Sequence, residues 1–130
     1  MMRQALAIRR RVFIEEQGVP EELETDEDDA GAFHAIAILD GKPVGCGRYV
    51  ACGDAVKIGR MAVLPELRLS GIGVRMLDFL MDDARSRGYS RAVLHAQLHA
   101  EGFYLRNGYK PVGGVFEEAG IRHIKMQRSL

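Results

Sequence analysis

The feature that most constrains this chain is an apolar segment that leads through a glycine loop into a long amphipathic segment. Residues 56–64 are mostly apolar and stop at Pro65, and the loop glycines are Gly71 and Gly73. From Gly71 to Gly88, apolar residues recur at helical spacing and most charged residues fall on the other face. The order predicts a strand, a tight loop and a helix, as in folds that pack helices on a sheet.

The loop Arg68-x-x-Gly71-x-Gly73 predicts an anion site at the start of that helix. A helix N-terminus leaves backbone N–H groups unpaired and carries partial positive charge. Glycines let the backbone close on a phosphate, and Arg68 adds a charged contact. The spacing differs from the P-loop and from the dinucleotide fingerprint. We expect a pyrophosphate here; the alternative is a structural turn without a ligand.

The rest of the chain divides into short elements separated by turn residues. Periodicity and turn signals predict helices over residues 5–16, 71–88 and 99–107 and strands over 33–39, 44–52, 56–64, 91–97, 109–112 and 123–127. The acidic residues 21–29 are expected to form a loop, and Gly113, Gly114 and Gly120 to lie in another loop. We therefore expect one α/β domain over residues 1–130, with a central mixed sheet flanked by helices on both faces and parallel pairing across the strand–helix–strand connections.

Composition excludes several classes of protein. Eighteen basic and eighteen acidic residues give no net charge, which argues against a dedicated nucleic-acid binder. No apolar run approaches the ~20 residues needed to span a bilayer, and no signal-peptide core opens the chain, so we expect a cytoplasmic protein without a membrane partner. Cys46 and Cys52 share one expected strand, roughly 20 Å apart, too far for a disulfide. No metal site is expected.

Two motifs together resemble the GNAT superfamily of acyl-CoA-dependent N-acyltransferases. The first is the glycine loop after the strand that ends in Val63-Leu64-Pro65-Glu66, which looks like the superfamily's pyrophosphate motif. The second is Ala100-x-x-Phe103-Tyr104-Leu105-Arg106-Asn107-Gly108-Tyr109. The resemblance covers the chain from about Phe33 onward. It implies a GNAT-like fold and transfer of an acetyl group from acetyl-CoA to a primary amine, with a small-molecule amine as acceptor.

A narrower resemblance is to a bacterial subgroup whose substrates are mostly unassigned. It rests on Arg10-Arg11-Val12-Phe13-Ile14-Glu15-Glu16-Gln17-Gly18-Val19-Pro20 and on Leu94-His95-Ala96-Gln97. Two departures accompany it. The superfamily usually opens with a strand before the first helix, and we expect that strand to be absent here, which would leave an open sheet edge and favour a homodimer. Gln97 stands where many relatives carry Asn, and its amide can still bridge to the cofactor.

The resemblance assigns the cofactor-binding roles. Strand residues Met61, Ala62 and Val63 would pair with the pantetheine arm as an added strand. The N–H of Met61 or Ala62 would polarise the acyl carbonyl. The pyrophosphate would be held by the loop and first helical turn, namely Arg68, Leu69, Ser70, Gly71, Ile72, Gly73 and Val74.

Tyr104 is the expected general acid, because a phenol with a reference pKa near ~10 stays protonated at neutral pH and can donate to the departing thiolate. A general base must also deprotonate the amine, and Glu16, His34, His95 and His123 are the candidates. His95 ranks first among the histidines because it shares a strand face with Gln97. The acidic residues 21–29 would form either a mouth that attracts amines or a solvated loop.

Two other functions remain open at this point. A non-catalytic acyl-CoA sensor or interaction module would keep the glycine loop and would not need Tyr104. The first-helix pattern also resembles acyl-homoserine-lactone synthases, but those chains are longer and carry a tryptophan after the glycine, and this chain has no tryptophan.

Overall fold

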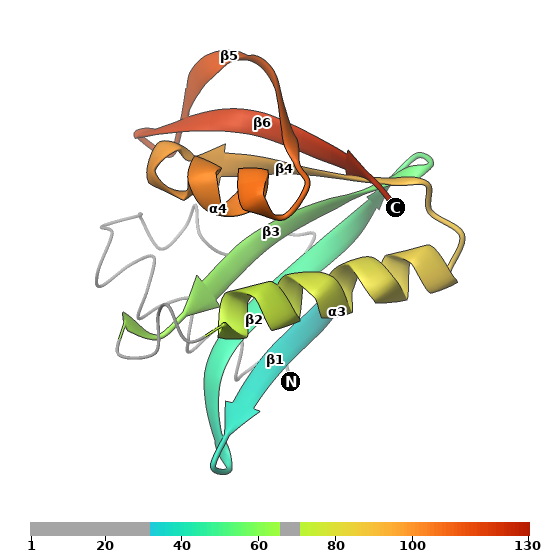
Figure 1. The fold of residues 1–130 in the computed structure, drawn as a ribbon, viewed down its shortest axis with the longest axis vertical. Coiled ribbons are helices and arrows are strands. Elements are labelled where there is room, and N and C mark those ends of the chain that lie inside the picture. The colour runs from blue at the N-terminus through green and yellow to red at the C-terminus, as the bar shows by residue number, and fades with distance from the viewer. Residues whose placement is uncertain (1–31, 66–70) are drawn as a thin grey trace.

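The computed structural model describes residues 32–65 and 71–130, which form a six-stranded sheet in the order β1-β2-β3-β4-β6-β5 (Figure 1). The strands are β1 (Phe33–Leu39), β2 (Lys42–Cys52), β3 (Ala55–Val63), β4 (Arg91–Gln97), β5 (Lys110–Glu118) and β6 (Ile121–Ser129). The helices are α3 (Ile72–Ser86), the 3-10 turn η4 (Leu98–Ala100) and α4 (Glu101–Arg106).

The sheet is mixed, as expected. The first three strands form an antiparallel meander, and the crossover through α3 sets β4 parallel to β3. The second crossover differs from the prediction. Strand β6 lies between β4 and β5 and is antiparallel to both, so β4 and β5 do not pair. The last strand, β6, therefore takes the place beside β4 that the prediction gave to β5, and β5 lies at the edge of the sheet.

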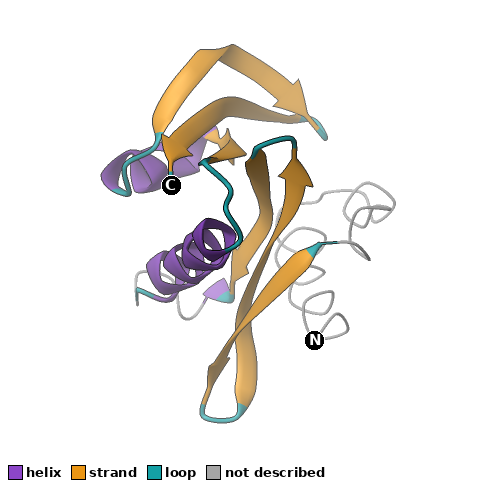
Figure 2. Ribbon diagram, turned by 90° about the vertical axis from the view of Figure 1, so that its right-hand side faces the viewer, coloured by secondary structure: helices purple, strands orange, loops and turns teal. Residues whose placement is uncertain are grey.

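The loop predicted around Gly113 and Gly114 is wrong. Both glycines lie inside β5, where the register with β6 shifts between Val112 and Phe116. Gly113 has a φ of 79°, a conformation that glycine adopts without strain. The extra residues form a bulge, and bulges bend the strand that carries them. Strand β5 is visibly bent at its middle (Figure 2).

Helices α3 and α4 lie on the same face of the sheet (Figure 2). We call this the helix-side face and the opposite one the far face. The main core joins buried residues of α3 to β3, β4 and β6, and Phe103 and Tyr104 of α4 pack against it. The helix expected over residues 5–16 lies outside the described residues, so the expectation of helices on both faces is not tested. None of the described helices is long and apolar enough to cross a membrane.

The C-terminal end of α3 is tied to the sheet by one polar network. The buried Tyr49 hydroxyl donates to the Asp83 carboxylate, which also accepts from Arg87 Nε at 2.9 Å. The Arg87 guanidinium lies 5.2 Å from the centre of the Phe33 ring. Both cysteines are free, as expected, with Cys46 buried and Cys52 exposed.

Candidate functional site

Strands β3 and β4 stop pairing about halfway along their length. Their parallel pairing runs only from Ala55 opposite Arg91 to Ile58 opposite Leu94. Beyond those residues the two strands diverge (Figure 1). We call the region between residues 59–63 of β3 and residues 95–97 of β4 the splay. In the splay these two central strands do not pair with each other.

The splay has a local cause in β3. Arg48 pairs with Gly59 and Cys46 pairs with Ala62, so Gly47 faces two residues of β3 instead of one. The extra residue is a β-bulge, and Arg60 has a φ of 53°. A bulge turns its strand, and here the turn directs the end of β3 away from β4. Of the residues predicted to bind the cofactor arm, Met61 lies in this bulge and Ala62 and Val63 lie beyond it.

The start of α3 presents backbone N–H groups. Gly71 is the N-cap residue with a φ of 87°, and no side chain of the described residues caps the helix. The Arg75 N–H is the first to bond back, to the Gly71 carbonyl, which leaves the N–H groups of the first turn without an intrahelical acceptor. A Cβ on Gly73 would meet only Phe103, at 3.5 Å. The two sequence motifs therefore meet at this point.

Tyr104 lies on α4 on the helix-side face. Its ring contacts Phe103 and Tyr109 edge-on, with centroids 5.1 and 5.7 Å away. Burial raises the pKa of its phenol to about 12. Among the described residues the Tyr104 hydroxyl has no hydrogen-bond partner, and no fully buried side-chain N or O atom there is unpaired, so the hydroxyl reaches the surface. The Tyr104 hydroxyl is therefore a protonated donor without an acceptor among the described residues.

His95 and Gln97 lie on the other face. Leu94 and Ala96 are buried in the helix-side core, so the alternating residues of β4 point to the far face. His95 is the first residue of β4 past the last pair with β3. Tyr104 and His95 thus approach the splay from opposite sides of the sheet.

The sequence reasoning missed Glu118, which contacts His95. His95 Nδ1 lies 2.7 Å from Glu118 Oε2, and the imidazole packs edge-on against Phe116 at 5.0 Å. Burial, the largest single influence, acts to raise the pKa of Glu118. The hydrogen bond from His95 and the nearby charges of His95, His123 and Lys57 together outweigh the effect of burial. They hold the pKa of Glu118 below its usual value.

The other candidate histidines are less well placed for catalysis. His123 is buried, with Nδ1 2.7 Å from the Ile121 carbonyl oxygen and its ring stacked on Phe116. His34 lies on β1, separated from β4 by β2 and β3. Of the histidines proposed as bases, His95 is the one at the splay with a partly exposed ring.

Several predicted residues lie outside the described part of the chain. These are the acidic residues 21–29 and the candidate site residues Glu16, Arg68, Leu69 and Ser70. The remaining ones lie on neighbouring elements: Met61, Ala62, Val63, His95 and Gln97 on the two strands of the splay, Gly71, Ile72, Gly73 and Val74 at the start of α3, and Tyr104 on α4 beside the Phe103 that Gly73 approaches. The described residues contain no cluster of His, Cys, Asp or Glu able to hold a metal ion.

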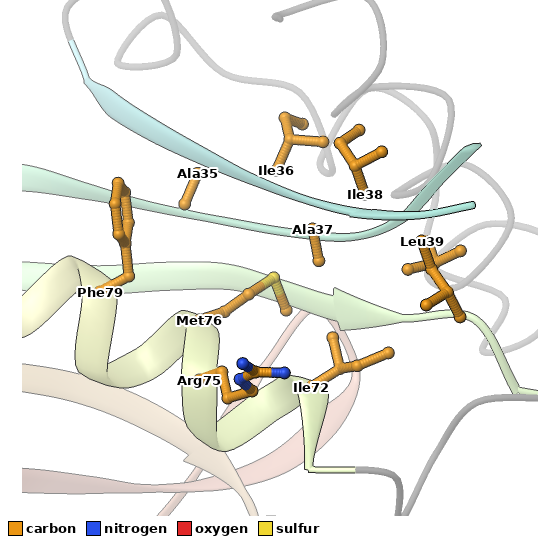
Figure 3. A pocket seen from close by; sticks show the side chains of 10 residues that line it. Ala35, Ile36, Ala37, Ile38, Leu39, Ile72, Arg75, Met76 and Phe79 are labelled. Atoms are coloured by element: carbon orange, nitrogen blue, oxygen red, sulfur yellow. The ribbon is translucent and has the colours of Figure 1, made fainter. Parts of the chain in front are cut away.

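A separate groove of about 370 Å³ lies between β1, the first strand in the order of the described sheet, and α3 (Figure 3). Its walls are apolar apart from Arg75. Figure 3 shows Arg75 beside Met76 and Ile72, below the strand. The groove shares only Ile72 with the predicted cofactor residues. It is not the place where the predicted catalytic groups meet.

Comparison with known proteins identifies the family. A family model described as an acetyltransferase (GNAT) domain matches residues 2–130. The uncharacterized N-acetyltransferase YjcF of Bacillus subtilis (strain 168) is 36% identical over 129 residues, which cover 98% of this chain and 91% of that protein.

Solved structures share the fold. An acyl-CoA N-acyltransferase from Pseudomonas aeruginosa is 28% identical with a TM-score of 0.78, over 96% of this chain and 88% of its own. An aminoglycoside 6'-N-acetyltransferase complexed with coenzyme A has a TM-score of 0.76 at 20% identity, over 98% of this chain and 89% of its own. The six-stranded mixed sheet is that of the GNAT fold, and the chain belongs to the GNAT acetyltransferase family, whose members are acyltransferases.

Proposed function

We propose that this protein transfers an acetyl group from acetyl-CoA to a primary amine by direct attack of the amine on the thioester. The observation that carries the proposal is the splay: β3 and β4 stop pairing after Ile58 and Leu94. A thioester at that point would have Tyr104 on one face of the sheet and His95 on the other. The family match and the coenzyme A bound by the aminoglycoside acetyltransferase support this choice of donor.

In this proposal the pyrophosphate of coenzyme A binds at the start of α3. The N–H groups of Ile72, Gly73 and Val74 would donate to it, since the helix has no side-chain cap and no acidic residue in its first turn. Arg68, Leu69 and Ser70 would complete this site. Gln97 at the end of β4 would donate its side-chain amide to the cofactor.

The pantetheine arm would lie along β3 in the splay as a ligand strand. The Leu64 N–H donates to the Val44 carbonyl of β2 at 2.9 Å. Because N–H groups alternate in direction along a regular strand, Ala62 also points toward β2, whereas Met61 lies in the bulge, where the ladder with β2 is interrupted. We therefore choose the Met61 N–H over that of Ala62 as the donor that polarises the acyl carbonyl.

Tyr104 would act as the general acid. The amine nitrogen attacks the carbonyl carbon, the C–S bond breaks, and the sulfur takes the phenolic proton. A phenol with a pKa of about 12 is fully protonated at neutral pH. Because a thiol has a pKa near ~8.5, this transfer is unfavourable as an isolated step. It must accompany C–S cleavage, and a proton shed by the attacking nitrogen would restore the phenol.

His95 would act as the general base. It would remove a proton from the amine, directly or through one water, on the far face of the sheet. The acceptor would then approach from the side opposite α3 and α4. This division keeps the acid beside the leaving sulfur and the base beside the incoming nitrogen, as the reaction requires. A small-molecule amine is the proposed acceptor; Glu16 is the alternative base.

Ligand-induced thermal shift tests the cofactor assignment. A ligand present at 100 times its Kd adds about 2.7 kcal/mol of stability, which raises the Tm by several degrees. We expect acetyl-CoA and CoA to raise the Tm, and ATP, NAD and S-adenosylmethionine to leave it unchanged. Absence of a shift with acetyl-CoA and CoA would contradict the proposal.

Tyr104→Phe tests the general acid, with Tyr109→Phe as its matched control. Both tyrosines lie at the same end of the core, but the Tyr109 hydroxyl is buried and donates to Met81 Sδ at 3.1 Å. We expect Tyr104→Phe to lower kcat by ~100-fold or more, measured as CoA thiol release, with acetyl-CoA affinity retained. Tyr109→Phe should retain kcat. Unchanged turnover in Tyr104→Phe would remove this residue from the mechanism, and binding without turnover in the wild type would favour an acyl-CoA sensor.

A further inference from the structure

The far face at the splay carries a small polar cluster built around His95. Its Nδ1 is paired with Glu118 Oε2 at 2.7 Å, and Phe116 holds the ring edge at 5.0 Å. Within the described residues, Nε2 has no hydrogen-bond partner, and the side chain is 27% exposed. Nδ1 of the imidazole is therefore fixed by a hydrogen bond, while Nε2 has no partner among the described residues.

Glu118 reaches His95 because of the bend in β5. Glu118 is the last residue of β5, opposite Ile121 at the hairpin turn, whereas His95 pairs with Lys125 farther along β6. In a flat sheet these positions would be well separated, with β6 between them. The bulge at Gly113 bends β5, and its far end brings Phe116 and Glu118 to the imidazole.

We propose that Glu118 is a positioning residue for His95, holding the imidazole as its Nδ1–H tautomer so that Nε2 presents a lone pair to the incoming amine. A carboxylate accepts hydrogen bonds and donates none, so it selects the tautomer that carries the proton on Nδ1. The inference rests on the proposed function, because it takes His95 as the base.

The charges around the pair are mixed. Lys125 on β6 pairs with His95 across the strands, and Lys57 on β3 and His123 on β6 act electrostatically on Glu118. Glu118 is thus the acidic member of an otherwise basic group on β3, β4 and β6. The ionised carboxylate also stabilises the imidazolium that forms when His95 accepts a proton, a state that the lysines would oppose.

Two substitutions at Glu118 separate its hydrogen bond from its charge. Glu118→Leu removes both the acceptor and the charge, whereas Glu118→Gln removes the charge and retains an amide oxygen that can accept from Nδ1. We expect Glu118→Leu to lower kcat by roughly 10- to 100-fold without changing the KM for acetyl-CoA, and Glu118→Gln to retain more of the rate. The pH profile of kcat should move in both variants.

The tautomer itself is measured by ¹⁵N NMR on the full-length protein without substrate, with His95→Asn to assign the signals. We expect the wild type and Glu118→Gln to show the Nδ1–H form and Glu118→Leu to lose that preference. An unchanged tautomer in Glu118→Leu overturns the inference. Unchanged kcat in Glu118→Leu also overturns it, while acetyl transfer by the wild type still stands.

Failure of the proposed function gives a different pattern. If the wild type releases no CoA with any amine, the acyltransferase assignment fails for those amines, and the NMR comparison alone decides whether Glu118 orients His95. If His95→Asn retains full turnover, His95 is not the base and the inference falls with it. Circular dichroism on each variant checks that the fold is intact.

Discussion

The two ends of β3 differ in what lies beside them. At the closed end, residues 55–58 pair with β2 on one side and β4 on the other, and Val56 and Ile58 are almost completely buried. At the open end, beyond the bulge at Arg60 and Met61, Ala62 and Val63 continue to pair with β2 but no longer with β4. One extra residue therefore turns a central core strand into a flank that a ligand strand can join.

The closed end of β3 contributes mainly to stability, and the open end contributes mainly to the proposed site. The closed end is dominated by apolar side chains that need neighbours of matching shape. The open end contributes backbone N–H groups, two ionisable side chains and a glycine helix start. Substitutions at the two ends should therefore be separable: the first kind should lower stability, and the second should alter binding or rate with little change in stability.

Leu94→Ala at the closed end should have the largest effect on stability. Leu94 is 2% exposed and is the last residue of β4 that pairs with β3. Truncating a buried leucine removes buried apolar surface and leaves a cavity, so we expect the free energy of unfolding to fall by about 2–5 kcal/mol. Denaturant unfolding measures it. Leu105→Ala, at a side chain 48% exposed, is the control and should change stability by less than ~0.5 kcal/mol.

Tyr49→Phe should have the next largest effect. Tyr49 pairs with Ile58 in the sheet, and its hydroxyl donates to Asp83 near the end of α3. Burial and the hydrogen bond to Asp83 raise the pKa of this phenol well above its usual value, so it is always a donor. Losing the bond should cost about 1–2 kcal/mol of stability, with no change in the Kd of acetyl-CoA. A weakened Kd at wild-type stability would contradict the division between the two ends.

Gly73→Ala sharpens the comparison at the open end. Its Cβ would meet only Phe103, at ordinary contact distance, and alanine favours a helix more than glycine does. We expect stability to be maintained or slightly raised. The Kd for acetyl-CoA should rise about tenfold, or ~1.4 kcal/mol, because the methyl group obstructs the phosphate at the backbone. Calorimetric titration and thermal unfolding measure the two quantities.

Gly71→Ala is the matched control for Gly73→Ala. Gly71 has a φ of 87°, so an alanine there is strained even though nothing lies within 4 Å of its Cβ. We expect a loss of about 1–2 kcal/mol of stability. If Gly73→Ala lowered stability as much as Gly71→Ala does, Gly73 would be structural and not a ligand-binding glycine.

The hairpin turns explain how far the sequence predicted the fold. Asp-Gly at residues 40–41 is a typical hairpin-turn sequence, and both residues have positive φ, 52° and 77°. Ala-Gly at residues 119–120 forms the same kind of turn, with φ of 53° and 75°, but alanine is an unusual residue for that conformation. The last hairpin was therefore predicted too short, and Glu118 was placed in a loop instead of a strand.

The sequence predicted those parts of the candidate site that depend on local motifs. It missed those that depend on contacts between residues far apart in the chain. The glycine helix start and His95 follow from residue spacing, Tyr104 follows from the resemblance to the GNAT superfamily, and β1 and β4 have the predicted bounds. The bulges in β3 and β5 leave no clear signal, because they depend on how each strand packs against its neighbours. The contact between His95 and Glu118, 23 residues apart, depends on one of those bulges.

Glu118→Gln should have a small effect on stability, and one that depends on pH. The pKa of Glu118 is lowered in the folded protein from its ordinary value of 4.5, so the carboxylate form favours folding. That contribution is present above the unfolded-state pKa and is lost as the pH falls through the folded-state pKa. Because the side chain is 44% exposed, we expect a difference below ~1 kcal/mol near neutral pH.

Unfolding free energies of the wild type and Glu118→Gln, measured from about pH 7 down to about pH 3, test this directly. The two curves should converge in acid, because protonated Glu118 resembles glutamine in charge. A gap that persists unchanged in acid would show that the variant disturbs packing, not an ion pair. The expected result is that the two unfolding free energies converge in acid and that the pH profile of kcat changes near neutral pH. Glu118 would then belong with the open end of β3, because its charge would affect the reaction more than the stability of the fold.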